Sequence, residues 1–225
     1  QILKLNDKEF SRIIKRKNQL KPWESLIVSE NLKWKEFLKI NNYLYELSGV
    51  KPVMSISRNY PFNDVFTHVV GYVSQPSEQD LLINEEIKEK FAPGLKVGKT
   101  GLEKTFEAEL IGSNDVERYE VNAYGKRINQ LEHHKGKRGN EIRLTIDTEV
   151  QKLCKELLKD KAGSISVMDI YTGEIIAMHS SPSFDANKFV FGIGEDDWQL
   201  IRNNPMKPLV NKSITGRYSP GSTIK

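Results

Sequence analysis

Apolar residues recur at helical spacing in four stretches of the first half of the chain. The first stretch opens with Asn6 and Glu9 in the form of a capping box, and Phe10, Ile13 and Ile14 follow on one face. The four predicted helices cover about residues 7–20, 31–47, 77–91 and 101–111. The first half is therefore expected to be rich in short helices.

Alternation of apolar and polar positions marks the stretches between these helices, and it is typical of half-buried strands. Residues 52–58 alternate in this way and predict one strand. Residues 116–121 and 127–131 alternate on either side of Tyr124-Gly125, which predicts a β-hairpin. Together with the helices, these strands predict a mixed α+β unit.

A polar, glycine-containing stretch at residues 135–140 separates this unit from a different pattern. Such a stretch is typical of a linker because it offers little apolar surface to a core. We therefore predict two domains, residues 1–139 and residues 140–225.

The second domain begins with a different order of elements. Residues 141–146 predict a strand, and Asp147 caps a helix in which Cys154 lies among apolar side chains as a small core residue. Residues 164–169 and 174–179 are apolar strands joined by a short turn. They predict a hairpin in the core of the second domain.

Composition and charge exclude several classes of protein. The 225 residues carry 34 basic and 30 acidic side chains that mostly interleave, so the net charge of +4 indicates no nucleic-acid partner. A single cysteine excludes a disulfide framework, and adjacent His133 and His134 would point to opposite faces of a strand, exposed rather than on a metal. No stretch approaches the roughly 18 apolar residues of a membrane helix. Because residue 1 is Gln, we expect the interior of a longer protein.

One glycine-rich stretch resembles a nucleotide-binding loop, but the spacing of its glycines argues against a nucleotide site. Gly94 and Gly98 have three residues between them where a phosphate-binding loop needs four, and Pro93 has no N–H to offer. The triplet Lys99–Gly101 also spells the KTG of penicillin-recognising enzymes, yet it precedes every candidate nucleophile and opens a helix. We predict that these residues form a turn without chemistry.

The last four residues carry the strongest candidate chemistry. Ser222 and Lys225 are three apart, so on a helix they share one face and the amine can reach the hydroxyl. A serine deprotonated by a neutral lysine is an established route to acyl transfer. The alternative is a helix-capping serine beside a solvated lysine. The motif is weak by itself, since Ser48 and Lys51 repeat the spacing where Gly49 opposes a helix.

The residues around this motif resemble the nucleophile region of class B penicillin-binding proteins. Further motifs of that family resemble stretches upstream and occur in the family's order. The matching stretches are Pro208–Lys225, Thr67–Val73, Gly98–Lys104, Val121–Gly125, Leu144–Asp147 with Val150-Gln151, and Thr172–Met178. The likeness covers most of the chain.

The resemblance implies an α+β fold: a non-catalytic pedestal domain of the dimerisation type over residues 1–139, then the beginning of a transpeptidase domain, α/β with an antiparallel sheet, over residues 140–225. It implies a peptidoglycan D,D-transpeptidase in which Ser222 attacks the carbonyl between two terminal D-alanines and Lys225 accepts the proton. β-Lactams would acylate the same serine, and no cofactor or metal is needed. The SxN triplet and the true KTG strand would follow Lys225, so this chain alone is expected to be inactive.

The resemblance also implies a place and partners for the whole protein. It would be anchored in the bacterial inner membrane by a segment outside these residues and would work on the periplasmic side. Its partners would be stem peptides, a glycan-strand polymerase and shape-determining scaffold proteins, as in the elongation-specific branch. Two alternatives stay open: the division-specific paralogue, and a non-catalytic scaffold module of the same machinery.

Overall fold

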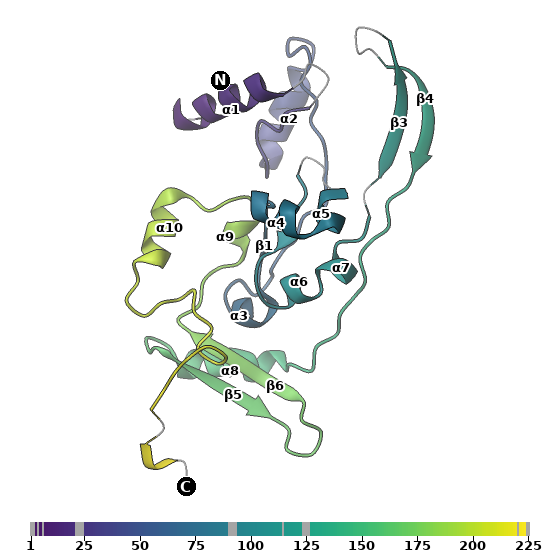
Figure 1. Cartoon of the computed structure of the whole chain (residues 1–225). Helices are drawn as coiled ribbons and strands as arrows, with labels where there is room; N and C mark the ends of the chain where they lie inside the picture. Colours follow the sequence, from purple (N-terminus) through teal and green to yellow (C-terminus); the bar gives the residue numbers. More distant parts are fainter. Residues whose placement is uncertain are drawn as a thin grey trace. The chain divides into compact units, whose positions relative to one another are not determined.

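The structure is a computed structural model that describes residues 3, 5, 7–20, 25–89, 94–113, 115–122, 127–219 and 221–223. The chain forms two compact units (Figure 1). Unit 1 comprises Gln1–Ser57, Glu89–Leu95 and Asn114–Gly136, and unit 2 comprises Arg58–Lys88, Lys96–Ser113 and Lys137–Lys225. Each unit is therefore discontinuous in sequence, with three segments that pack together. The domain boundary at 139/140 stays a prediction.

Unit 1 contains two of the predicted helices. Helix α1 spans Asp7–Gln19, and α2 spans Trp34–Asn42. Helix α2 is shorter than predicted because most backbone hydrogen bonds after Tyr43 go to the residue three positions back. The last of them joins Val50 N to Leu47 O at 3.1 Å. The predicted helix over residues 31–47 therefore continues as a series of turns.

Unit 1 also contains the predicted hairpin. Strand β3 (Val116–Val121) pairs antiparallel with β4 (Arg127–His134), while the predicted turn falls among residues outside the description. His133 and His134 are exposed, as predicted. The strand predicted over residues 52–58 is wrong: the segment makes no ladder within the described chain, and Ile56 is 95% exposed. Alternation shows that a segment suits a sheet, but it supplies no partner strand.

The first part of unit 2 consists of short elements. Strand β1 (Val73–Ser74) pairs with β2 (Val97–Gly98), and two predicted helices are each divided in two. Asn84 and Phe106 interrupt them, because their backbones leave the helical region with ψ of 103° and 29°. The helices are α3 (Thr67–Val70), α4 (Glu78–Ile83), α5 (Glu85–Glu89), α6 (Gly101–Thr105) and α7 (Glu107–Leu110).

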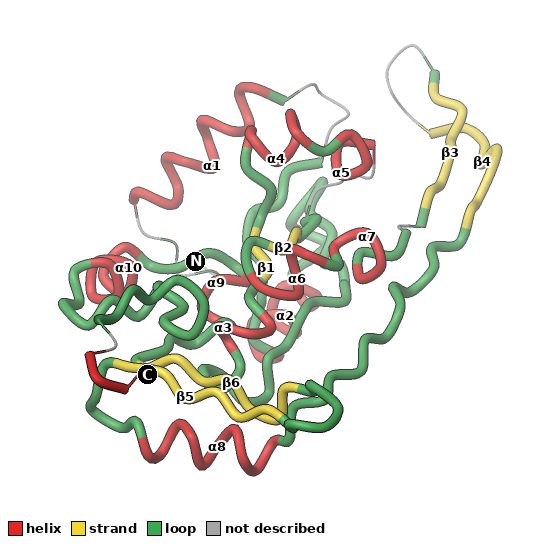
Figure 2. The backbone as a smooth tube through the Cα atoms, turned by 60° about the horizontal axis from the view of Figure 1, so that its bottom comes forward, coloured by secondary structure: helices red, strands yellow, loops and turns green. Residues whose placement is uncertain are grey.

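The second part of unit 2 holds the other predicted hairpin. Strand β5 (Gly163–Met168) pairs with β6 (Ile175–Ser181), and α8 (Thr148–Leu157) lies along it in both views (Figures 1 and 2). Asp147 caps α8 as predicted, since its carboxylate accepts the N–H of Glu149 at 2.8 Å and that of Val150 at 2.9 Å. Cys154 is buried, also as predicted.

Three features of this part differ from the prediction. Residues 141–146 form no strand; the segment is tied to the start of β6 by isolated bonds, such as Thr145 Oγ1 to Ile175 O at 2.7 Å. Helices α9 (Asn187–Val190) and α10 (Glu195–Arg202) lie where no element was predicted. The last described element is a single 3₁₀ turn, η1 (Gly221–Thr223).

The core of unit 2 joins residues from both sides of the predicted boundary. Tyr60 and Val73 pack with Ala186 and Val190, and Tyr72 covers the cluster. None of the helices in the described part of the chain has the length and apolar character needed to span a bilayer.

Candidate active site

Ser222 lies in η1 with its side chain exposed, one residue after a turn in the left-handed region at Gly221, where φ is +56°. Glycine suits that conformation because it has no Cβ. Lys225 lies outside the described residues, so the Ser222–Lys225 geometry stays a prediction. In Figure 1 the yellow C-terminal trace runs past the β5–β6 hairpin and on to η1.

The segment that leads to Ser222 is fastened to α3 at Pro208–Asn211. His68 Nε2 lies 2.8 Å from Pro208 O, and Asn211 Nδ2 donates to His68 O at 3.0 Å. Because a carbonyl oxygen only accepts, the neutral imidazole carries its proton on Nε2. Burial lowers the pKa of His68, which favours that neutral form.

Strand β6 fastens the same segment from a second direction. Ser180 Oγ donates to Val210 O at 3.2 Å and accepts from Lys212 N at 2.9 Å. The Ser180 side chain is fully buried and occupies both its donor and its acceptor positions in this way. Segment 208–212 is thus held between α3 and β6, both in unit 2.

A buried glutamine joins three further segments of unit 2. Gln151 on α8 has no exposed surface, and its Nε2 donates to Val65 O at 3.0 Å and to Met178 O at 2.9 Å. Its Oε1 accepts from Met178 N at 2.9 Å. The side chain therefore uses every proton it has, tying α8 to β6 and to the turn before α3.

Asn187 and Glu103 fix the chain around Tyr60. The Asn187 amide accepts from Tyr60 N at 2.9 Å and donates to Tyr60 O at 2.8 Å, so it acts as a neighbouring strand would. Glu103, 4% exposed, is paired with Arg58 Nε at 2.8 Å and accepts from the Tyr60 hydroxyl at 3.2 Å. Burial and the nearby Glu103 carboxylate raise the pKa of Tyr60 above its usual value.

The KTG triplet opens α6, as predicted, and it directly follows β2, a short buried strand that was not predicted. Lys99 forms an ion pair with Asp80; burial alone would raise the pKa of Asp80, but the bonds from Lys99 and Ser77 outweigh it and lower that pKa to about 2. A Cβ on Gly71 would overlap Thr100 O, and Gly101 sits at φ +59°. The triplet serves packing between α3 and α6.

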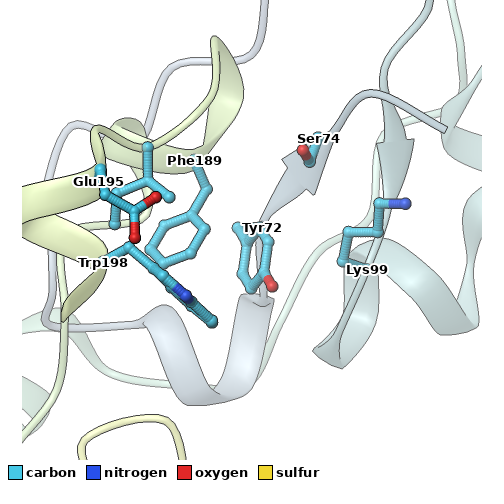
Figure 3. Close-up of a pocket in the computed structure, with 7 residues that line it drawn as sticks. Tyr72, Ser74, Lys99, Phe189, Glu195 and Trp198 are labelled. Atoms are coloured by element: carbon cyan, nitrogen blue, oxygen red, sulfur yellow. The ribbon is translucent and has the colours of Figure 1, made fainter. Parts of the chain in front are cut away.

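An open pocket of unit 2 lies elsewhere and has a volume of about 360 Å³. Its lining residues are Tyr72, Ser74, Lys99, Phe189, Ile193, Glu195 and Trp198. Figure 3 shows aromatic rings at its centre and the Lys99 amine directed away from them. Within the described part of the chain, no group of three or more His, Cys, Asp or Glu residues is placed to hold a metal ion.

Ser222 and Lys225 stay predictions as catalytic residues. The buried polar residues that organise the fold around the segment leading to them were not predicted from the sequence. The burial of Gln151 could have been predicted, since Gln151 lies three residues before Cys154 on the same helix face. A polar residue on an apolar face indicates a buried hydrogen-bonding role. His68 and Asn187 carried no comparable signal, because their partners are more than a hundred residues away.

Comparison with known proteins decides the family. The model of the penicillin-binding protein dimerisation domain matches residues 1–144. The chain belongs to the penicillin-binding proteins. The model of the penicillin-binding protein transpeptidase domain matches residues 163–225, in the order expected for this family. The predicted fold class, an α+β pedestal followed by the start of a transpeptidase domain, is confirmed.

Relatives of this penicillin-binding protein are named peptidoglycan D,D-transpeptidase MrdA. The relative from Acinetobacter baumannii is 34% identical over 224 residues, which cover 100% of this chain and 33% of the relative. The relative from Escherichia coli K12 is 33% identical over 226 residues, which cover 100% of this chain and 36% of the relative. The chain spans about a third of these relatives.

Solved structures of similar proteins agree with the family. The complex between PBP2 and MreC from Helicobacter pylori gives a TM-score of 0.70 at 28% identity, covering 92% of this chain and 42% of the other. Pseudomonas aeruginosa PBP2 in complex with WCK 5153 gives 0.62 at 32%, covering 77% and 34%.

Proposed function

We propose that this chain is part of a peptidoglycan D,D-transpeptidase of cell-wall elongation. The observation that carries the proposal is that both family domains match in one chain, and that the transpeptidase match runs through Ser222 to residue 225. The name shared by the MrdA relatives supports the reaction. The division-specific paralogue is the alternative within the same family.

In the proposed reaction the Ser222 hydroxyl attacks the carbonyl between two terminal D-alanines. Lys225 takes the hydroxyl proton, and the terminal D-alanine leaves with a proton as a free amino acid. The amine of a neighbouring stem peptide then attacks the acyl-enzyme, which forms the cross-link and returns the proton to Ser222. A β-lactam would acylate the same serine. The exposed position of Ser222 beside the Gly221 turn supports access by an extended peptide.

The proposal includes a location and partners. The whole protein would be anchored in the bacterial inner membrane and act on its periplasmic side, with a glycan-strand polymerase and a shape-determining scaffold protein as partners. The solved complex of the Helicobacter pylori relative with MreC supports the scaffold partner. The family membership of the chain supports the location.

The pedestal half has a second candidate function, which is to bind partner proteins. In unit 1 the segment containing Val53, Met54 and Ile56 is exposed, with 71%, 85% and 95% of the respective residues accessible. A segment with several exposed apolar side chains offers apolar surface that a partner protein could cover. Both functions can belong to one protein. If Ser222→Ala in the relatives' full length still captured a scaffold partner, the two roles would be separable.

Release of D-alanine tests the catalytic proposal. A protein of the relatives' full length that carries this chain should release D-alanine from a pentapeptide ending in D-Ala–D-Ala. Ser222→Ala should abolish release, and Lys225→Ala should lower it about 10²- to 10⁴-fold. Ser48→Ala is the matched control, because Ser48 sits in the second Ser-x-x-Lys of the chain and should leave the rate unchanged. Release that survives Ser222→Ala would contradict the assignment.

A further inference from the structure

Helix α3 belongs to the part of the chain matched as a dimerisation domain, yet it contacts the segment that carries the proposed nucleophile. His68 in α3 bonds to Pro208 O, and its own carbonyl accepts from Asn211 Nδ2. Both contacts span about 140 residues of sequence. They lie within unit 2, so one compact body contains both partners.

Asn211 links α3 to the turn formed by residues 211–215. Its backbone oxygen accepts from Thr215 N at 2.9 Å and from Thr215 Oγ1 at 2.7 Å, while its Oδ1 accepts from Ser213 N at 3.1 Å. The same residue thus uses its Nδ2 for α3 and its oxygens for the turn. Fixing Asn211 therefore fixes residues 211–215.

The order extends from this turn toward Ser222. A Cβ on Gly216 would overlap Lys212 O and the ring of Tyr218, so the chain folds back closely at this point. Tyr218 lies four residues before Ser222. The defined contacts that start at α3 therefore extend along the chain to residues 216–218, a few residues before the proposed nucleophile.

The surroundings of His68 keep its ring in one orientation. The ring packs edge-on against Phe184, with centroids 5.8 Å apart and planes at 84°. The neighbouring Thr67 Oγ1 donates to Phe184 O at 2.8 Å. A ring fixed in this way presents Nε2–H to Pro208 O without losing further rotamer freedom.

We propose that His68 is a positioning residue for the transpeptidase nucleophile: through Pro208 and Asn211 it fixes the segment from which Ser222 is presented. The inference rests on the proposed function for its catalytic part. It assigns to the pedestal motif a direct share in the geometry of the active site. Small displacements of a nucleophile matter, since about 1 Å of misplacement can cost about 10²-fold in rate.

The test compares three variants in a protein of the relatives' full length. His68→Phe keeps the ring against Phe184 but removes the donor, and His68→Gln places an amide N–H near the position of Nε2. Ser181→Ala is the matched control, because Ser181 is also buried on β6 and its hydroxyl donates to Leu158 O at 3.1 Å, outside residues 208–218. The readouts are the rate of acylation of Ser222 by a fluorescent penicillin, hydrogen exchange of residues 209–218, and the melting temperature.

We expect His68→Phe to slow acylation about 10- to 100-fold and to speed exchange of residues 209–218 at least about tenfold. His68→Gln should restore both to within a few-fold of the wild type. Ser181→Ala should lower the melting temperature similarly and leave both other readouts unchanged. Acylation of His68→Phe at the wild-type rate, or an equal loss in Ser181→Ala, would overturn the positioning role. An unreactive wild type would instead overturn the proposed function, while the exchange measurement, which needs no reaction, would still decide whether His68 fixes the segment.

Discussion

Side-chain amides and a hydroxyl take the place of backbone partners at several points of unit 2. Gln151, Asn187 and Ser180 each satisfy two or more groups on other segments, and all of these bonds lie between 2.8 and 3.2 Å. A buried group that loses its partner costs about 1–3 kcal/mol, whereas an intact bond contributes about 1 kcal/mol. These residues therefore matter chiefly because their removal would leave others unpaired.

Gln151→Leu should lower the free energy of unfolding by about 2–4 kcal/mol, because it leaves both backbone groups of Met178 without their partner and leaves Val65 O with only the His179 ring. Urea unfolding followed by fluorescence measures the change. Gln199→Leu on α10 is the control, since Gln199 is exposed and should change stability by less than about 0.5 kcal/mol. Equal stability of the two variants would contradict the role assigned to Gln151.

Short elements are where the sequence and the structure differ most. The β3–β4 and β5–β6 hairpins and the cap of α8 could be predicted, because each depends on residues close together in sequence. The predicted strands over 52–58 and 141–146 do not form in the part of the chain that the structure describes. Their alternating pattern could not show this, since a strand also needs a partner strand, which can lie far away in the sequence. Helix α9 is too short for a period to appear, although the acids Glu195, Asp196 and Asp197 in the first turn were a usable sign of α10.

The packing of α3 against α6 requires glycine at position 71. Gly71→Ala should destabilise the protein by more than about 2 kcal/mol, because φ is +84° and the new Cβ would overlap Thr100 O. Gly192→Ala also has a positive φ, +95°, but nothing lies within 4 Å of its Cβ, so it should cost only about 1 kcal/mol. Thermal unfolding of both variants separates conformational strain from steric overlap. A Gly71→Ala loss no larger than that of Gly192→Ala would rule out the overlap.

The ion pair between α4 and the loop after β2 should give stability a specific pH dependence. The pKa of Asp80 is about 2 in the folded protein and 3.8 in the unfolded chain. The unfolded chain therefore binds the proton first as the pH falls. The contribution, on the order of 2 kcal/mol, is complete above about pH 4 and is lost toward pH 2. Asp80→Asn should therefore be less stable than the wild type at pH 6 and approach it at pH 2 in urea titrations. A constant difference across this range would show that Asp80 is not responsible.

At the scale of the whole molecule, the family match and the compact units of the structure divide the chain at different residues. The dimerisation match ends at residue 144, but residues 58–88 and 96–113 within it pack in the same unit as residues 137–225. The motifs that carried the resemblance could be recognised from the sequence. Their mutual contacts could not, because partners such as His68 and Asn211 are brought together only by the fold.

The proposed function depends above all on Ser222 being the nucleophile of a penicillin-binding transpeptidase. The most direct measurement is mass spectrometry after incubation with a fluorescent penicillin, for this chain and for a protein of the relatives' full length. We expect an adduct on Ser222 in the longer protein and none in the 225-residue chain, because the family resemblance places the SxN triplet and the true KTG strand of the site after Lys225. An adduct on another residue, or equally fast labelling of Ser222 in the 225-residue chain, would contradict it.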